Sequence, residues 1–539
     1  MQLSPSAHTD TFCRDNLPAP DQWPDLEFTL PELKYPDRLN AADALLDPTL
    51  EAGGADRRCV LSPTETWTYG DLSRHAAQVA SVLTEDFGLV PGSRVLLRGP
   101  NNPWLAACWL GVLKAGGVAV ATMPMLRAAE LTSICDIAQV KLALCDHRLT
   151  ADLRAAAVPE LQIVEFGGAD PGDLTKLAAA KPAEFPSVQT AADDVAMIAF
   201  TSGTTGKPKA AMHFHRDLLA AADTFSAHVL KPVPDDLFAG TPPLAFTFGL
   251  GALLLFPLRV GAATLLLEKA TPAELADAIA EHGVTVLSTA PTAYRAMLAA
   301  GKAEQLRGLR RPVSAGENLP KSTWQAFYDA TGVKIIDGIG STEMLHIFMA
   351  CADDDIRPGS TGKAVPGYTA AVLDRDGNAV PDGEPGRLAV KGPTGCRYLN
   401  DERQRTYVQR GWNLTGDTYI RDEDGYFWYQ ARSDDMIISG GYNIAGPEIE
   451  EVLLSHPDVA ECGVVGVPDQ ARGQLVKAYV VLASGATGGE EKARELQDLV
   501  KQRIAPYKYP RAVEFVTTLP RTNTGKLQRF RLRAQAAAD

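Results

Sequence analysis

Short apolar runs alternate with amphipathic, helix-like patterns along most of the chain. The runs that predict strands are RVLLRG, GVAVAT, KLALCD, LQIVEF, VAMIAF, ATLLLE, VTVLST and VKIIDG. Alternation of strands with helices is typical of α/β proteins. The pattern therefore predicts a large, multi-layer α/β domain in the N-terminal part of the chain.

One connecting helix is specified by its own sequence. In TPAELADAIAEHG, Thr271 can cap the helix, Pro272 suits its first turn, and Glu274 completes a capping box. Gly283 is a typical helix end. We expect a helix between these residues.

The pattern changes past about residue 430, where the apolar runs become ECGVVGVPD, KAYVVLASG and RAVEFVTTLP. Charged helical patterns, PEIEEVLLSH and EEKARELQDLVKQRI, separate these runs and predict a smaller α/β domain. The segment between the two regions holds Gly440 and Gly441, which are typical of a joint. We predict an N-terminal domain of residues 1–432 and a C-terminal domain of residues 433–539.

The most apolar stretch is FGLGALLLFPLRVGAATLLLE, which begins at Phe248. Pro257 and Arg259 lie in its middle, and a charge at that depth disfavours a membrane span. We predict a buried helix followed by a buried strand.

Composition narrows the class of protein. A chain of 539 residues, 45% hydrophobic and 22% charged, can bury several cores. Its net charge of -14 argues against a general nucleic-acid or membrane-surface binder and still permits one local basic pocket. The eight cysteines show no metal-type spacing, which favours small core residues. The N-terminus does not resemble a signal peptide, so we expect a cytoplasmic protein.

The densest candidate chemistry is TSGTTGKPK, residues 201–209, directly after the run VAMIAF. Glycines let consecutive N–H groups point into one concavity, hydroxyls add donors, and two lysines add charge for a polyphosphate. It is not a Walker A loop, because Pro208 follows Lys207. A solvated turn is the alternative interpretation. The candidate phosphate-binding residues are Thr201, Ser202, Gly203, Thr204, Thr205, Gly206 and Lys207.

This segment resembles the phosphate loop of the adenylate-forming enzymes, the superfamily of acyl-CoA synthetases, peptide-synthetase adenylation domains and beetle luciferases. Four further segments follow in that family's order: DGIGSTEM, TGD, ARSDDMIISGGYNIAGPEIE and PRTNTGKLQR. The resemblance spans nearly the whole chain. It implies a large α/β domain, a small mobile C-terminal domain, ATP as a substrate and Mg²⁺ as a cofactor.

The resemblance implies a nucleotide site built from several segments. Glycine in SAGENLP would permit close approach of the adenine ring, and the aspartate of TGD matches one that accepts the ribose hydroxyls. The implied ATP-binding residues of these segments are Gly316, Glu317, Asp337, Gly338, Asp417 and Arg432.

Thr342, Glu343 and Lys526 carry the implied catalysis. Glu343 offers a hard oxygen ligand for Mg²⁺ on the phosphates. Lys526 matches a lysine that reaches the substrate carboxylate and the α-phosphate, where it balances charge during adenylation. In isolation, each would be an ordinary surface residue.

Asp434 matches the family's hinge residue, about which the small domain turns once the adenylate exists. That rotation would withdraw Lys526 and bring Gly440 and Gly441 to the thiol channel, where a missing side chain leaves room for a pantetheine arm. Glycines that serve a hairpin are the alternative explanation.

Two segments, PPLAFTFGLG and STEMLHIF, resemble the acid pockets of benzoate and 2-aminobenzoate CoA ligases. The flanks MHFHRDLLA and APTAYRAML resemble the 2-aminobenzoate type. Bulky side chains would form a flat slot for one ring, whereas a long acyl chain needs small residues. Ordinary core packing is the alternative for each. The candidate pocket residues are Phe246, Thr247, Phe248, Gly249, Gly340, His346 and Ile347.

Together these features predict an AMP-forming ligase that joins an aromatic carboxylic acid to coenzyme A through an acyl adenylate. Alternatives are a stand-alone adenylation enzyme that loads a carrier protein, a medium-chain acyl-CoA synthetase, and an inactive nucleotide binder. The presence of Lys526, Glu343 and Asp417 disfavours the last of these. The sequence leaves the oligomeric state and the ring substituents open.

Overall fold

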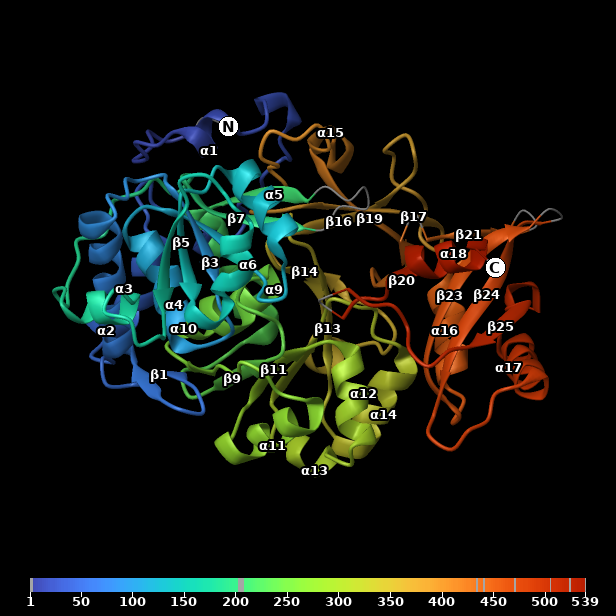
Figure 1. Cartoon of the computed structure of the whole chain (residues 1–539). Coiled ribbons are helices and arrows are strands. Elements are labelled where there is room, and N and C mark those ends of the chain that lie inside the picture. The colour runs from blue at the N-terminus through green and yellow to red at the C-terminus, as the bar shows by residue number, and fades with distance from the viewer. Residues whose placement is uncertain are drawn as a thin grey trace.

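The computed structural model describes residues 3–201, 208–432, 435–439, 442–469, 472–504, 506–522 and 525–538. Figure 1 shows a large N-terminal domain on the left and a small C-terminal domain, in orange and red, on the right. The fold is mixed α/β, as the sequence predicts. Within the described ranges, no helix combines the length and the apolar character needed to cross a membrane.

The first sheet of the large domain has, in the described residues, six strands in the order β6-β5-β3-β4-β7-β8. Its neighbours are parallel except β7 and β8, which pair antiparallel with Thr201 opposite Lys209. Strands β3, β4 and β5 are buried throughout, which explains their continuous apolar runs. The strands are β3 (Arg94–Arg98), β4 (Val118–Thr122), β5 (Leu142–Asp146), β6 (Gln162–Phe166), β7 (Val195–Thr201) and β8 (Lys209–Phe214).

The second sheet has nine strands in the described part of the chain, in the order β15-β14-β13-β12-β11-β9-β10-β1-β2. Strand β1 pairs parallel with β10, and Val60 lies opposite Thr264. Strands β13 and β14 form an antiparallel hairpin. The strands are β1 (Arg58–Leu61), β2 (Thr66–Thr68), β9 (Leu237–Gly240), β10 (Ala263–Leu265), β11 (Val286–Thr289), β12 (Arg311–Ser314), β13 (Ile336–Gly340), β14 (Ile347–Ala350) and β15 (Lys363–Ala364).

Two further sheets complete the chain. An antiparallel sheet follows the nine-stranded one and consists, in the described residues, of β16 (Thr369–Leu373), β17 (Pro385–Lys391), β18 (Val408–Gln409), β19 (Trp412–Arg421) and β20 (Phe427–Arg432). The sheet of the small domain consists of β21 (Ile437–Ser439), β22 (Tyr442–Ile444), β23 (Val459–Asp469), β24 (Gly473–Leu482) and β25 (Ala512–Phe515). The last three contain the apolar runs that predict strands in this region.

The α-helices up to β9 are α1 (Phe12–Asp15), α2 (Ala41–Glu51), α3 (Tyr69–Ser81), α4 (Pro103–Lys114), α5 (Ala128–Ala138), α6 (Thr150–Ala155), α7 (Leu174–Ala179) and α8 (His215–Ala221). Those that follow are α9 (Thr247–Leu250), α10 (Phe256–Val260), α11 (Pro272–His282), α12 (Pro291–Ala299), α13 (Ala303–Leu306), α14 (Lys321–Thr331) and α15 (Gln404–Tyr407). The small domain contains α16 (Gly446–Leu454), α17 (Glu490–Arg503) and α18 (Arg529–Ala538).

Helix α11 confirms the capping prediction. The Thr271 hydroxyl accepts a hydrogen bond from the Glu274 backbone N–H at 3.3 Å. The Glu274 carboxylate accepts one from the Thr271 N–H at 2.8 Å. Gly283 ends the helix in the left-handed region, at φ 71°.

The long apolar stretch forms a buried helical segment followed by strand β10, as the sequence predicts. Its middle, Gly251–Leu255, is π-helical and lies between α9 and α10. A second π-helical segment, Ala222–Leu230, continues α8. Such segments occur frequently at functional sites.

All eight cysteines are free, and all but Cys351 are buried, which agrees with their interpretation as core residues.

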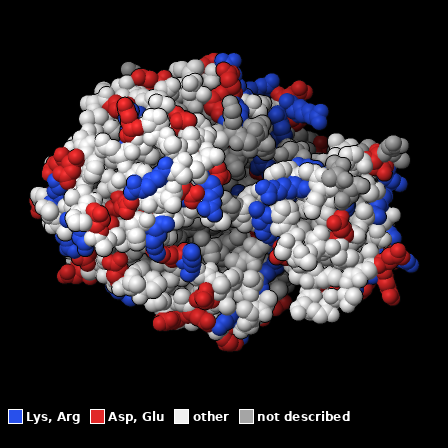
Figure 2. All heavy atoms as spheres, viewed as in Figure 1, with Lys and Arg blue, Asp and Glu red and all other residues white. Residues whose placement is uncertain are grey.

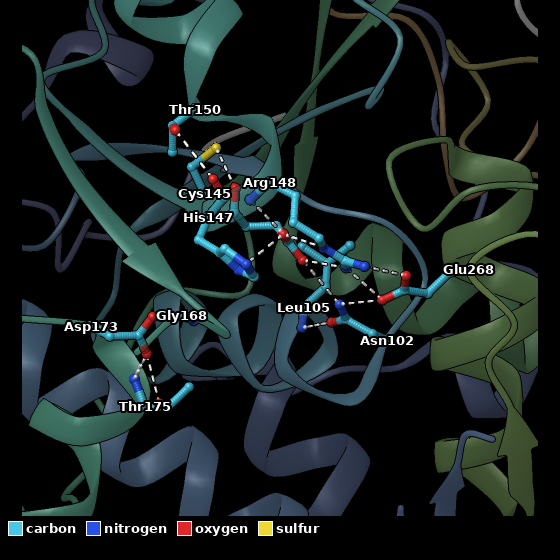
Figure 3. Close-up of polar contacts among 11 residues, drawn as sticks. Asn102, Leu105, Cys145, His147, Arg148, Thr150, Gly168, Asp173, Thr175 and Glu268 are labelled. Carbon is cyan, nitrogen blue, oxygen red and sulfur yellow. Dashed lines mark hydrogen bonds and ion pairs between the residues drawn. The ribbon is translucent and has the colours of Figure 1, made fainter. Parts of the chain in front are cut away.

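A polar network connects the two large sheets (Figure 3). The Arg148 guanidinium donates to Glu268, beyond β10, at 2.7 and 2.8 Å, and to Asp146, at the end of β5, at 2.8 Å. The Asn102 amide donates to Glu268 at 3.2 Å, while its carbonyl caps α4. The network fixes the relative positions of the sheets at the ends of β5 and β10.

Candidate active site

Lys526 lies in the small domain, just before α18, and approaches the large domain. Figure 2 shows that the surface is hollowed between the two domains. A Cβ built on Gly316, in the turn after β12, would be 4.0 Å from the Lys526 Cε. Gly316 has φ 90°, which favours glycine. The structure therefore brings together two residues that lie far apart in the sequence and were both predicted to act on ATP.

The electrostatic surroundings of Lys526 include several other predicted site residues. The pKa of its ammonium group is lowered, chiefly because the surrounding protein displaces water from it. Asp417, Glu343 and Glu317 raise this pKa, whereas the Arg432 guanidinium lowers it. The residue as a whole nevertheless keeps solvent-accessible surface. Such an arrangement can stabilise negative charge that develops on a bound molecule.

Glu343 lies in the turn between β13 and β14 and is 7% exposed. It accepts a short hydrogen bond from the Tyr398 hydroxyl. The Lys209 ammonium lies 3.3 Å from the same hydroxyl. The Thr342 carbonyl accepts a hydrogen bond from the His213 Nε2 at 2.8 Å, which fixes the start of this turn.

The donor set around Glu343 fits Mg²⁺. The described residues contain no group of three or more His, Cys, Asp or Glu side chains that would form a protein-only metal site. Mg²⁺ is commonly held by one or two carboxylates together with substrate phosphates, a pattern that a single glutamate satisfies. Glu343 could supply this carboxylate.

The turn that carries Glu343 is strained. Leu345 has φ 70°, a left-handed conformation that is unfavourable for a bulky side chain. Its N–H donates to the Thr342 carbonyl at 3.1 Å, and the Met344 N–H donates to the Ser341 hydroxyl at 3.2 Å. Strain of this kind costs about 1–3 kcal/mol and concentrates at functional sites.

Asp417 lies within strand β19 rather than in a turn, so it does not serve as a helix or turn cap. It is opposite Arg432 on β20, whose guanidinium donates to the carboxylate at 3.3 Å. Gly416 has φ 79°, and a Cβ there would be 2.9 Å from the Arg432 Nη2. The glycine therefore allows the arginine to approach the strand.

Asp337 and Gly338 lie on strand β13. The Asp337 Oδ1 is buried and has no hydrogen-bond partner among the described residues. Burial raises the pKa of this carboxyl well above its ordinary value. A Cβ on Gly338 would lie 2.9 Å from the Ile347 side chain, so the close pairing of β13 with β14 requires glycine there.

The acid-pocket candidates divide into two groups. His346 is buried and contacts Phe248, with 5.7 Å between ring centroids and 3.3 Å from its Nε2 to the Phe248 carbonyl. Phe225 and Phe256, which the sequence analysis missed, complete an aromatic cage at 5.6 and 4.5 Å from the imidazole. Phe246 is the N-cap residue of α9, and Thr247 is its first residue, directly before Phe248.

Gly249 and Gly340 have packing roles. A Cβ on Gly249 would lie 2.1 Å from the Pro243 carbonyl oxygen, and one on Gly340 would lie 2.6 Å from that of His346. Both glycines therefore permit close contact between backbone segments.

Several predictions fall on residues that the structure does not describe. They concern Ser202, Gly203, Thr204, Thr205, Gly206 and Lys207 of the phosphate loop, and Asp434, Gly440 and Gly441 of the hinge and thiol channel. Thr201 is described and ends β7.

Comparison with known proteins defines the class. The AMP-binding enzyme family matches residues 49–398, and the C-terminal domain of AMP-binding enzymes matches residues 448–526. The chain belongs to this family, the adenylate-forming superfamily that its motifs resemble.

Similar proteins include ligases of aromatic acids. The benzoate–CoA ligase of Thauera aromatica is 36% identical over 94% of this chain and 98% of its own length. The crystal structure of the anthranilate CoA ligase AuaEII, in complex with anthranoyl-AMP, has a TM-score of 0.90 and 35% identity, covering 94% of this chain and 100% of that one. The benzoate CoA ligase from Burkholderia xenovorans LB400 has a TM-score of 0.85 and 34% identity, covering 92% and 100%.

Proposed function

We propose that the chain is an AMP-forming ligase that converts a benzoate with a small polar ortho group, most specifically 2-aminobenzoate, into its coenzyme A thioester. The observation that carries the ligase assignment is the approach of Lys526 to Gly316, among the charges of Asp417, Glu343 and Arg432. The similarity to benzoate and anthranilate ligases supports an aromatic acid.

In the first half-reaction, a carboxylate oxygen of the acid attacks the α-phosphorus of ATP, and the bond to pyrophosphate breaks. The Lys526 ammonium would balance negative charge on the attacking oxygen and on phosphorus. Asp417 would accept the ribose hydroxyls and Glu343 would hold Mg²⁺. The metal, when bound, would neutralise charge on the phosphate oxygens.

In the second half-reaction, the coenzyme A thiolate attacks the acyl carbonyl, and AMP leaves as the C–O bond breaks. We propose that the small domain turns about Asp434 between the steps. Lys526 would then leave, and Gly440 and Gly441 would line the thiol channel. A domain rotation separates the reaction at the α-phosphorus from the reaction at the acyl carbon, which need different protein groups.

The ortho preference is inferred from polar atoms near the aromatic cage. If the His346 Nε2–H donates to the Phe248 carbonyl, its Nδ1 becomes an acceptor, and this buried atom has no partner among the described residues. Burial lowers the pKa of His346 to about 3, so the ring stays neutral near pH 7. An ortho amine could donate to this nitrogen or bond with the Thr247 hydroxyl, which benzoate cannot do.

A substrate panel with ATP, Mg²⁺ and CoA tests the proposal. We expect kcat/KM for 2-aminobenzoate to exceed that for benzoate by up to about a hundredfold, since an unpaired buried polar group costs roughly 1–3 kcal/mol. Thr247→Val should remove the preference if the hydroxyl makes the contact. A preference unchanged in Thr247→Val would place the amine nearer His346. Preference for octanoate over both acids would refute the aromatic assignment, and transfer only to a carrier protein would refute coenzyme A as the thiol.

A further inference from the structure

Arg521 connects the two domains beside Lys526. Its Nη1 donates to the Glu317 carboxylate of the large domain at 3.0 Å. Its Nη2 donates to Glu461, on strand β23 of the small domain, at 2.7 Å. The side chain is 27% exposed. One guanidinium therefore bridges carboxylates from both domains.

The same arginine holds the turn that carries Lys526. Arg521 and Leu527 form an isolated antiparallel bridge. Between them, the Thr522 N–H donates to the Lys526 carbonyl at 2.7 Å, and the Lys526 N–H donates to the Thr522 hydroxyl at 3.0 Å. The Arg521 Nη1 also donates to the Gly525 carbonyl at 2.6 Å. The position of Lys526 is thereby coupled to that of the Arg521 side chain.

Arg521 and Lys526 approach neighbouring residues of the large domain. Arg521 bonds to Glu317, and Lys526 lies near Gly316, where an added Cβ would be 4.0 Å from the Lys526 Cε. Burial raises the pKa of Glu317, and the Arg521 guanidinium opposes this rise. The Arg521 guanidinium therefore favours the ionised form of the Glu317 carboxylate where the two domains meet.

A second polar contact supports the same arrangement. The Ser322 N–H, in the first turn of α14, donates at 2.7 Å to Glu451 on α16 of the small domain. Helix α14 receives no side-chain cap from its own N-cap residue, Pro320. A carboxylate at a helix N-terminus is favourable. The domains therefore meet at two defined polar points.

We propose that Arg521 is a positioning residue that places Lys526 for adenylation through its bond to Glu317 and releases that bond, while keeping Glu461, when the small domain turns. The inference rests on the proposed function, because it assumes that Lys526 acts in the first half-reaction. Since partly exposed ion pairs add little stability, the expected role is geometric.

The test measures the half-reactions separately in Arg521→Gln, Arg521→Lys and Arg494→Gln. Pyrophosphate exchange with 2-aminobenzoate reports adenylation, and thioester formation from supplied acyl adenylate and CoA reports the second step. Arg494 is the matched control, because its pair with Glu490 is exposed and lies within α17.

We expect Arg521→Gln to lower kcat for adenylation by roughly 10–100-fold, the scale of losing a well-placed charged contact, with little change in KM for ATP. Thioester formation and the unfolding midpoint should stay close to those of the native enzyme. Arg521→Lys should recover part of the rate, because lysine keeps the charge but not the fork geometry. Arg494→Gln should behave like the native enzyme.

Equal loss in both half-reactions, or unchanged adenylation in Arg521→Gln, would overturn the inference. A double-mutant cycle with Glu317→Gln adds a direct measure, because coupled residues give non-additive losses. Lys526→Ala distinguishes a failure of the positioning role of Arg521 from a failure of the proposed function of Lys526. If it loses adenylation while Arg521→Gln does not, only the positioning role fails. If Lys526→Ala keeps full adenylation, the proposed function of Lys526 fails.

Discussion

Gly251→Ala is expected to disrupt the aromatic cage around His346. Gly251 begins the π-helical segment and lies directly against the imidazole ring. A Cβ there would be 2.3 Å from the His346 Cδ2, 2.7 Å from its Nε2 and 3.0 Å from the Phe256 Cζ. Favourable carbon contacts occur at about 3.5–4.0 Å, so the ring would have to move by more than about 1 Å.

The structure leaves the ring little room for such a movement. Phe225 stacks on the imidazole and Phe256 meets it edge to face. Overpacking of this kind costs about 1–3 kcal/mol, and loss of the His346–Phe248 hydrogen bond adds about 1 kcal/mol. We therefore expect the free energy of unfolding of the large domain to fall by roughly 2–4 kcal/mol.

Denaturant titration of the large-domain transition measures this loss, and steady-state kinetics measure KM for the aromatic acid, which should rise. Gly308→Ala is the matched control, because a Cβ there meets nothing within 4 Å. In a His346→Ala background, Gly251→Ala should cost much less, because the two closest imidazole atoms are gone and only the Phe256 Cζ, at 3.0 Å, remains. A cost equal to that of Gly308→Ala would refute the steric argument.

Three further predictions concern charges. Because the pKa of Lys526 is lowered, its ammonium group should lose its proton at a lower pH than an ordinary lysine does. The adenylation kcat/KM of the native enzyme should therefore fall at that lower pH, whereas the rate that remains in Lys526→Arg should persist to higher pH. An unshifted alkaline limb would contradict this. Tyr398→Phe removes the hydrogen bond to Glu343 and should raise the Mg²⁺ concentration for half-maximal adenylation about tenfold, as for other residues that orient metal ligands. An unchanged Mg²⁺ titration would argue against Glu343 as the ligand. Asp217→Asn leaves the fully buried Arg397 without its charge partner and should lower the free energy of unfolding by about 3–5 kcal/mol, a loss that denaturant titration would detect. A loss below about 1 kcal/mol would show that Arg397 finds another partner.

Local sequence patterns predict the elements well and their arrangement poorly. The box formed by Thr271 and Glu274 involves atoms three residues apart, so the sequence alone specifies it. The strands are visible because burial on both faces demands continuous apolar runs. Their division between two sheets, with Val60 opposite Thr264, depends on packing between distant segments and leaves no local signal.

Local sequence patterns also fail to predict which distant residues meet at the candidate site. Lys526 and Gly316 were assigned to one site through motifs that resemble a family, not through any pattern that links the two positions. Arg521 was missed, because an arginine in a polar loop is usually solvated and its partner Glu317 is distant in sequence. Tyr398 was missed because a single tyrosine between Arg397 and Leu399 belongs to none of the motifs.

The pairing of β1 with β10 bears on how the chain acquires its structure during synthesis. All strands of the six-stranded sheet lie in one continuous section, from Arg94 to Phe214, so this sheet can form as soon as that section has left the ribosome. Strand β1 is made earlier, yet its parallel partner Thr264 follows Val60 by roughly 200 residues, which is about 10–40 s of translation at 5–20 residues per second. During that interval, the edge of β1 that later pairs with β10 is open to other chains. The order of synthesis therefore makes the earliest strand of the nine-stranded sheet the one most in need of protection from aggregation.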